Sequence, residues 1–291
     1  MYYLVYGLLY LISLLPFWIL YGISDFAYFL IYRVIGYRKE VVLSNLALAF
    51  PEKTLEERKV IAKKFYRNFT DNFIEVIKLL SISEKALRKK FVGEWDTMNS
   101  HYESGKNIQL HLGHFFNWEI ANLALSYSSV YPVLTVYMPI ANKAMNRLFN
   151  TIRGRFNAKL ISATNYLREF KPYSKQRFCL VFVADQSAGA THTAYWLPFF
   201  GKLTPFVTGP EKSAKLNNTV AFYVKFIKVK RGHYHVSFFE ITNDARSLPE
   251  GEITKRMISS LEDNIREQPE NYLWTHRRWK HEFDSAKHRM L

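Results

Sequence analysis

The sequence contains a single cysteine among its 291 residues, so no disulfide can form within the chain. That residue, Cys179, stands inside an apolar run at positions 178–183, where we expect a buried and unreactive thiol. The cysteine content therefore gives no reason to place the protein in an oxidising compartment.

Several catalytic motifs are also missing. The chain has no glycine-rich phosphate loop of the P-loop or dinucleotide type and no Gly-x-Ser-x-Gly turn. His111 and His114 have the spacing of a metal-binding pair, but no other convincing ligand cluster accompanies them, and Phe115 and Phe116 are poor neighbours for a metal. We therefore predict no cofactor, no metal and no serine nucleophile.

Acidic residues are few, with 25 Asp and Glu against 40 Lys and Arg, which gives a formal net charge of +15. Such a balance indicates a polyanionic partner, which can be nucleic acid, an anionic lipid or an acidic carrier protein. Composition alone does not choose among these three.

Charge is almost absent from the N-terminus, where Asp25 is the only charged side chain up to residue 32. Residues 2–24 carry none and are rich in tyrosine, so the segment is long and apolar enough to cross or enter a bilayer. Pro16 interrupts it and predicts a kink or a split helix. A secretory signal peptide is not expected, because a basic start and a small-residue cleavage site are both lacking.

Positive charges follow this segment at Arg33, Arg38 and Lys39. Cationic residues remain preferentially on the cytoplasmic side, so we expect the rest of the chain to lie there. We predict a membrane-anchoring segment at residues 1–35 and a single α/β domain at residues 36–291. The alternative is that residues 1–35 form an aromatic core helix of a soluble domain.

The remaining pattern predicts a helical first third followed by alternating strands and helices. Thr54 and Glu57 form a capping pattern that opens a long helix to about residue 80. Apolar runs at about 108–112, 130–137, 159–161 and 177–184 alternate with helical segments, and residues 218–229 and 234–240 flank a turn. We therefore predict a mostly parallel or mixed central sheet flanked by helices, and an irregular segment at 189–210.

The most informative motif places His114 five residues before Glu119, just after an apolar run. Residues five apart on one helix lie about 140° apart, so the two side chains meet only if His114 precedes a helix that contains Glu119. A neutral imidazole can take a proton from an alcohol, and a carboxylate can orient it. We interpret the pair as a candidate base and its orienting group.

Two further candidates lie beyond this corner. Asp185 and Gln186 directly follow an apolar strand, where open α/β sheets bind ligands, although a simple turn aspartate fits the position equally well. Arg153 and Arg155 are suited to phosphate contacts, or else form a solvated basic helix end.

The C-terminal stretch at residues 272–280 mixes aromatic and cationic side chains. This mixture suits nucleic acid through stacking, or a membrane surface through headgroup contacts. Because the same chain carries an apolar N-terminal segment, we predict membrane or anionic lipid contact and no nucleic acid. The residues predicted to make it are Trp274, Arg277, Arg278, Trp279 and Lys280.

These segments, in this order, resemble the bacterial lipid A biosynthesis acyltransferases, the late HtrB-like branch of the lysophospholipid acyltransferase superfamily. The resemblance covers nearly the whole chain. The matching blocks are Arg38-Lys39-Glu40-Val41-Val42, Asn45-Leu46, Phe50-Pro51, the His-x4-Glu block from His114 to Glu119, Arg153-Gly154-Arg155-Phe156-Asn157, Asp185-Gln186, Pro198-Phe199-Phe200-Gly201 and the stretch from Tyr272 to Lys280.

The resemblance implies a glycerol-3-phosphate-acyltransferase-like fold at the cytoplasmic face of the bacterial inner membrane. It implies transfer of a fatty acyl chain from acyl carrier protein to a hydroxyl of an anionic lipid A precursor, with His114 as general base and Glu119 as its orienting group. The implied substrate-binding residues are Asn117, Arg153, Arg155, Asp185 and Gln186.

One position departs from the family pattern, because Phe116 stands where many members have glycine. Phenylalanine resists the backbone conformations that glycine permits, so the corner or the acyl pocket is expected to differ. Two alternatives remain open: the same transfer to a glycerolipid, aminolipid or pigment, and a non-catalytic lipid-binding protein on the same scaffold.

Overall fold

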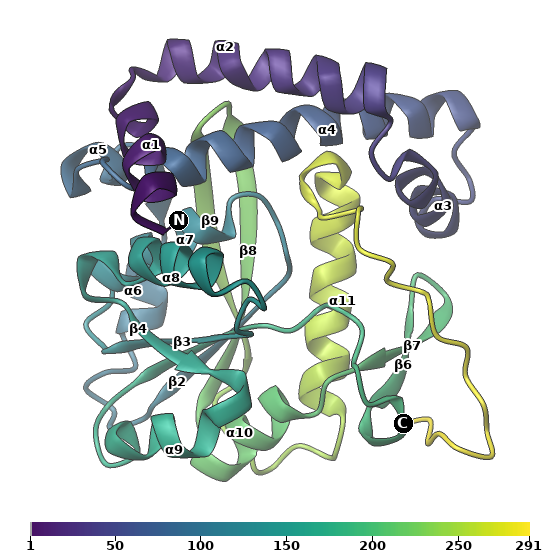
Figure 1. Ribbon diagram of the computed structural model, residues 1–291. Helices are drawn as coiled ribbons and strands as arrows, with labels where there is room; N and C mark the ends of the chain where they lie inside the picture. Colours follow the sequence, from purple (N-terminus) through teal and green to yellow (C-terminus); the bar gives the residue numbers. More distant parts are fainter. Residues whose placement is uncertain (1) are drawn as a thin grey trace.

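A computed structural model describes residues 2–291, and its first third is helical, as predicted (Figure 1). Pro16 separates the first two helices, because it has an extended backbone and no N–H to donate. The elements of this part are α1 (Tyr2–Leu14), α2 (Phe17–Tyr28), the π-helix η1 (Phe29–Ile35), α3 (Lys39–Ala49), α4 (Leu55–Lys78) and the short α5 (Glu84–Arg88).

Helix α4 begins with the capping box that the sequence indicates. The Thr54 side chain accepts a hydrogen bond from the Glu57 N–H, and Glu57 accepts one from the Thr54 N–H at 2.7 Å. Phe65, Phe69 and Val76 recur on its buried face, so α4 packs one side against the domain. Figure 1 shows α2 lying along the opposite side of α4.

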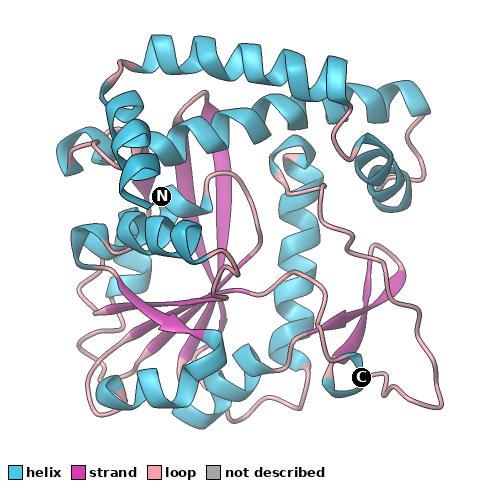
Figure 2. Cartoon of the chain, viewed as in Figure 1, coloured by secondary structure: helices cyan, strands magenta, loops and turns pink. Residues whose placement is uncertain are grey.

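The core is a seven-stranded mixed sheet in the order β1-β9-β8-β2-β5-β3-β4, which confirms the predicted fold class (Figure 2). Strands β8 and β9 pair antiparallel, and every other neighbouring pair is parallel. The strands are β1 (Phe91–Gly93), β2 (Ile108–Leu112), β3 (Val133–Tyr137), β4 (Lys159–Ser162), β5 (Cys179–Val183), β8 (Val220–Lys230) and β9 (His233–Thr242).

Helices and short 3-10 turns surround this sheet. Cys179 is fully buried on β5, as predicted, and burial raises the pKa of its thiol. The remaining elements are α6 (Trp95–Asn99), α7 (Trp118–Ser128), α8 (Lys143–Arg153), η2 (Arg155–Asn157), η3 (Ala163–Asn165), α9 (Tyr166–Phe170), η4 (Lys171–Tyr173), η5 (Thr191–Thr193), α10 (Gly209–Asn217), α11 (Glu252–Glu267) and η6 (Pro269–Asn271).

The segment at 189–210 is not wholly irregular, which corrects the prediction. It contains an antiparallel pair, β6 (Tyr195–Phe199) and β7 (Lys202–Phe206), joined by a two-residue turn. Phe200 and Gly201 in this turn have positive φ angles of 49° and 75°, the combination that lets a tight turn follow the twist of a hairpin. Two prolines in these strands obscure the pattern in the sequence.

The register of the central strands decides where the candidate site forms. Leu112 at the end of β2 pairs with Val183 at the end of β5, in parallel. His114 and Asp185 each stand two residues beyond these partners, so both leave the same edge of the sheet side by side. Ligands of open α/β sheets bind beyond this carboxyl edge.

Candidate active site

The turn that carries His114 is held from the side by the C-terminal part of the chain. The Phe116 N–H donates to the Asn271 carbonyl at 3.0 Å, and the Leu273 N–H donates to the His114 carbonyl at 3.1 Å. A Cβ on Gly113 would come within 2.5 Å of the Leu261 side chain, so a larger residue here would displace buried side chains. The backbone at His114 is therefore fixed by α11 and by the chain that follows it.

The imidazole of His114 contacts Asp185, with 2.5 Å between His114 Nδ1 and Asp185 Oδ1. Asp185 is 1% exposed, whereas the His114 side chain is 18% exposed. Burial alone would raise the pKa of Asp185, but the neighbouring imidazole and its hydrogen bonds lower that pKa to about 2. The aspartate is therefore ionised at neutral pH and can only accept a hydrogen bond.

This contact determines which ring nitrogen is free. An ionised aspartate requires the proton on His114 Nδ1, so Nε2 of a neutral ring carries the lone pair. Nε2 makes no hydrogen bond to any of residues 2–291. His114 thus combines a fixed orientation with a basic nitrogen available to a substrate hydroxyl.

Glu119 lies in the first turn of α7 and is paired with Arg153 rather than with His114. Arg153 donates from Nε to Oε2 at 2.8 Å and from Nη2 to Oε1 at 2.5 Å, and the Trp118 indole N–H donates to Oε1 at 3.1 Å. Burial alone would lower the pKa of Arg153, but the Glu119 carboxylate raises it. The predicted orienting role of Glu119 is not confirmed, since Asp185 occupies that position.

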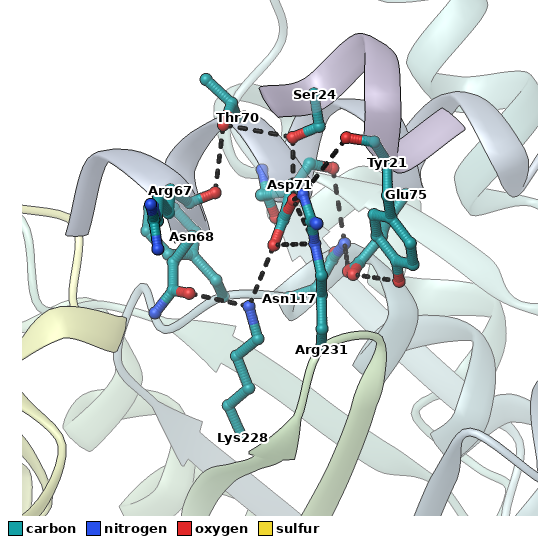
Figure 3. A network of polar contacts seen from close by, with 12 residues as sticks. Tyr21, Ser24, Arg67, Asn68, Thr70, Asp71, Glu75, Asn117, Lys228 and Arg231 are labelled. Atoms are coloured by element: carbon teal, nitrogen blue, oxygen red, sulfur yellow. Dashed lines mark hydrogen bonds and ion pairs between the residues drawn. The ribbon is translucent and has the colours of Figure 1, made fainter. Parts of the chain in front are cut away.

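Asn117, predicted to bind substrate, is fully buried and caps helix α7. Its Oδ1 accepts hydrogen bonds from the N–H groups of Glu119 and Ile120 at 3.1 and 3.2 Å. Its Nδ2 donates to Glu75 on α4 at 3.3 Å (Figure 3). The side chain therefore starts the helix that carries Glu119, and its hydrogen-bonding groups are already used.

Arg155 is likewise engaged by the protein. Its guanidinium donates to the carbonyl of Leu79, and to that of Ile82 at 2.7 Å, just beyond the end of α4. Burial lowers its pKa. The structure therefore gives Arg155 a role in holding α4, and the predicted substrate contact has no support from its position.

A cavity of about 610 Å³ opens beside His114 at the carboxyl edge of the sheet. Its polar wall includes His114, Glu119, Arg153 and Gln186, while Asp185 lies behind His114. Most of the remaining wall is apolar and includes Leu112, Leu125, Val136, Met138, Tyr166, Phe182, Val183 and Val207. An apolar cavity with a few polar groups at one point is typical of a small-molecule or lipid site.

Two of the residues predicted to contact the membrane are inside the protein. Trp274 and Arg278 are only 1% and 2% exposed, which contradicts that prediction for both. Arg278 donates to Ser187 Oγ at 3.2 Å and to the Pro205 carbonyl at 3.3 Å. An amphipathic sequence pattern does not distinguish a segment that binds a membrane surface from a C-terminal segment that packs on its own domain.

The other three members of this stretch differ from one another. Trp279 is half-buried and donates from its indole N–H to the Phe199 carbonyl at 3.2 Å. Arg277 and Lys280 are exposed, so a lipid contact stays a prediction for these two.

Two functional features were not found from the sequence. The sequence indicated Asp185 as a separate candidate directly after a strand, but it did not indicate the contact between Asp185 and His114. Glu75, buried in the last turn of α4, had no signal, because a single carboxylate in an amphipathic helix is usually solvated. His111, considered as a metal ligand, is buried with its Nε2 2.9 Å from Gln109 Nε2. Among residues 2–291 no group of three His, Cys, Asp or Glu side chains could hold a metal ion.

Comparison with known proteins agrees with the resemblance. The profile described as "Bacterial lipid A biosynthesis acyltransferase" matches residues 1–281. The chain is 25% identical over 247 residues to a lipid A biosynthesis palmitoleoyltransferase of Escherichia coli, covering 84% of this chain and 79% of that protein. It is 24% identical over 236 residues to a lipid A biosynthesis acyltransferase of Haemophilus influenzae, covering 79% and 72%.

The profile match extends over almost the whole chain, and the site contains a candidate base beside an apolar cavity. The protein therefore belongs to the bacterial lipid A biosynthesis acyltransferase family and is an acyltransferase.

Proposed function

We propose that this enzyme transfers a fatty acyl chain from the thioester of acyl carrier protein to a hydroxyl of an anionic lipid A precursor. The observation that carries the proposal is the His114–Asp185 pair beside the apolar cavity. Family membership and the names of its relatives support the substrate class.

In this mechanism His114 Nε2 removes the proton as the acceptor hydroxyl attacks the thioester carbonyl. The ionised Asp185 stabilises the resulting imidazolium and keeps the ring in place, as the aspartate does in a catalytic triad. The tetrahedral intermediate then collapses, the carbon–sulfur bond breaks, and the leaving thiolate takes the proton from the imidazolium. No covalent acyl-enzyme is required.

Arg153 is the cation best placed to contact a substrate oxygen. Glu119 holds its Nε and Nη2, whereas its Nη1 makes no hydrogen bond within the part of the chain that the structure describes. A guanidinium held in this way presents its remaining donors in a fixed direction. We assign Glu119 the task of positioning Arg153 in the cavity wall, with Gln186 as a further polar contact and the apolar wall holding the acyl chain.

The same proposal places the enzyme at the cytoplasmic face of the bacterial inner membrane. The helix formed by Phe17–Ile35 is long and apolar enough to cross a membrane, and cations follow it in the sequence. A net charge of +15 suits both an anionic lipid acceptor and an acidic carrier protein.

Purified protein incubated with acyl carrier protein thioesters and a lipid A precursor tests the function directly. We expect mass spectrometry to show the acceptor gaining one acyl chain, and His114→Ala to give no product while its unfolding temperature stays close to that of the parent. Acylation by the parent of a glycerolipid, but not of the lipid A precursor, would identify the other acceptor class. Unchanged turnover by His114→Ala would remove the base assignment.

A further inference from the structure

The apolar N-terminal segment contacts helix α4 from Ser13, near the end of α1, to Tyr32 in η1. Lys78, the last residue of α4, donates from Nζ to the carbonyls of Ser13 and Leu15 at 2.8 and 2.9 Å. Ser81 Oγ, just beyond α4, also donates to the Ser13 carbonyl at 2.7 Å. The start of the segment is thus held at the C-terminal end of α4.

The middle of the segment is held by buried polar contacts, which Figure 3 shows from close by. The Tyr21 hydroxyl donates to Glu75 Oε1 at 3.0 Å, and Ser24 Oγ donates to Asp71 Oδ1 at 2.8 Å. Arg231, at the tip of the β8–β9 hairpin, bridges Asp25 on α2 and Asp71 on α4 at 2.8 and 2.6 Å. The one acidic residue of the apolar segment is therefore paired with the folded domain.

The last turns of the N-terminal segment also lie along α4. The Arg67 guanidinium of α4 lies 5.3 Å from the ring centre of Tyr28, and the rings of Tyr32 and Tyr66 are 5.1 Å apart. As the chain advances from Ser13 to Tyr32, its partners recede from Ser81 to Tyr66. The two helices therefore run antiparallel, side by side (Figure 1).

The opposite face of the segment is apolar and exposed. Leu20, Ser24, Tyr28 and Tyr32 recur every four residues and are buried. On the other side of the helix, Trp18, Phe26 and Phe29 are 76%, 64% and 52% exposed. Further exposed apolar residues lie on α1 and η1: Tyr3, Leu4, Leu8, Leu11, Leu14, Val34 and Ile35.

Helix α4 cannot accompany its partner across a bilayer. The part of α4 that contacts the segment carries Arg67, Asp71, Glu75 and Lys78, and the β8–β9 hairpin adds Lys228 and Arg231 beside it. A helix crossing the hydrocarbon while seated on α4 would draw these charges into it, and charged side chains at that depth are strongly disfavoured. A helix parallel to the membrane surface keeps them in water and still buries its apolar face.

We propose that the helix formed by residues 17–35 binds the bilayer surface lengthwise, with the face of Trp18, Phe26 and Phe29 in the boundary between headgroups and acyl chains, and does not cross the membrane. The partner is an anionic lipid bilayer, because Arg33, Arg38 and Lys39 stand at the end of this face. The inference rests on the membrane association proposed above and adds its geometry.

Paired cysteines test this geometry in membranes. Ser24 Oγ and Thr70 Oγ1 are 3.2 Å apart, so Ser24→Cys with Thr70→Cys, in a Cys179→Ala background, should form a disulfide in isolated membranes under mild oxidation. The matched control, Phe26→Cys with Thr70→Cys, should form none, since Phe26 is on the outward face. A second pair, Ser13→Cys with Ser81→Cys, should also link and covers the case that the first pair fails to fold. Membrane-bound chains in which neither folded pair links would overturn the proposal.

The side of the membrane that holds the N-terminus provides an independent test. A protease-cleavable tag before residue 1 should be cut in inverted inner-membrane vesicles and protected in spheroplasts. Cleavage in spheroplasts would show that the segment spans, and recovery of the chain in the soluble fraction would overturn both the geometry and the membrane association. Neither readout requires turnover, so a failed acyl-transfer assay would leave this inference standing.

Discussion

Two buried carboxylates in this protein have opposite electrostatic settings. Asp185 and Glu75 are each 1% exposed. Burial alone would raise the pKa of either, but Asp185 contacts an imidazole that can become a cation, and its pKa falls to about 2. Glu75 accepts hydrogen bonds from Tyr21, Tyr234 and Asn117, which are neutral, and burial keeps its pKa raised.

The difference shows that burial raises the pKa of a buried acid unless a potentially cationic partner outweighs it. A charged Asp185 contacts His114 and, in the proposed mechanism, orients it. Glu75 instead joins three structural elements: the N-terminal segment, the β8–β9 hairpin and, through Asn117, the start of α7. One buried carboxylate, Asp185, thus lies in the proposed catalytic site at the sheet edge. The other, Glu75, joins structural elements beneath α2.

The largest effect expected is on catalysis at Asp185. Asp185→Asn removes the charge that stabilises the His114 cation and permits the wrong tautomer, so we expect kcat to fall by about 10²–10⁴-fold. Steady-state kinetics with an acyl carrier protein thioester measures this. Nearly normal turnover would show that Asp185 does not orient the base.

Glu119→Gln should lower activity less, by about 10²-fold, because it weakens the hold on Arg153 and leaves His114–Asp185 intact. Arg153→Lys is the matched variant, since lysine keeps the charge but cannot form the two parallel hydrogen bonds. Similar losses in both variants would support a shared role. A loss in Glu119→Gln greater than in Asp185→Asn would favour the orienting role that the sequence suggested for Glu119.

At Glu75 the main effect should be on stability. Glu75→Ala leaves the hydroxyl of buried Tyr234 without an acceptor and removes one of the two acceptors of the Asn117 amide, and we expect a loss of about 2–3 kcal/mol in unfolding free energy. Denaturant unfolding followed by circular dichroism measures this loss. A variant as stable as the parent would show that water satisfies these groups.

Acid unfolding should distinguish the contribution of Asp185 to stability from that of Glu75. The folded pKa of Asp185, about 2, is below its ordinary value of 3.8, so its contribution is complete above about pH 4 and is lost as the pH falls towards 2. A shift of this size is worth about 2 kcal/mol. Asp185→Asn should therefore lose less stability than the parent between pH 4 and pH 2, and equal slopes would contradict the ion pair.

The smallest effect should come from Glu75→Gln. Burial raises the pKa of Glu75, and glutamine keeps the shape of the side chain without its charge, so we expect a smaller change near neutral pH than in Glu75→Ala. Stability of the parent should also fall as the pH rises through the raised pKa of Glu75, whereas Glu75→Gln should not show this fall. A large loss in Glu75→Gln would mean that the carboxylate is charged.

Much of the fold was predictable because its signals are local. The Thr54–Glu57 capping box, the break at Pro16 and the alternation of strands with helices depend on neighbouring residues alone. The hairpin at β6 and β7 was missed, because prolines at positions 198 and 205 are unusual in strands.

The site was predictable only in part. The sequence identified His114 at a strand-to-helix corner, and it identified Asp185 as a separate candidate. It did not join them, because they are 71 positions apart in the sequence and only the β2–β5 register brings them together. Glu119 attracted attention as the nearest carboxylate in the sequence, while in space its partner is Arg153.

By itself, then, the sequence determined the family, the helical and strand segments, the histidine and an apolar N-terminus, since each is written in short patterns or in their order. The tertiary structure decided which carboxylate contacts the histidine, which arginines are already engaged, and that Trp274 and Arg278 are buried. The physical reason is that hydrogen bonds and burial depend on distances in space. Strand order and helix packing set those distances between residues that are far apart along the chain.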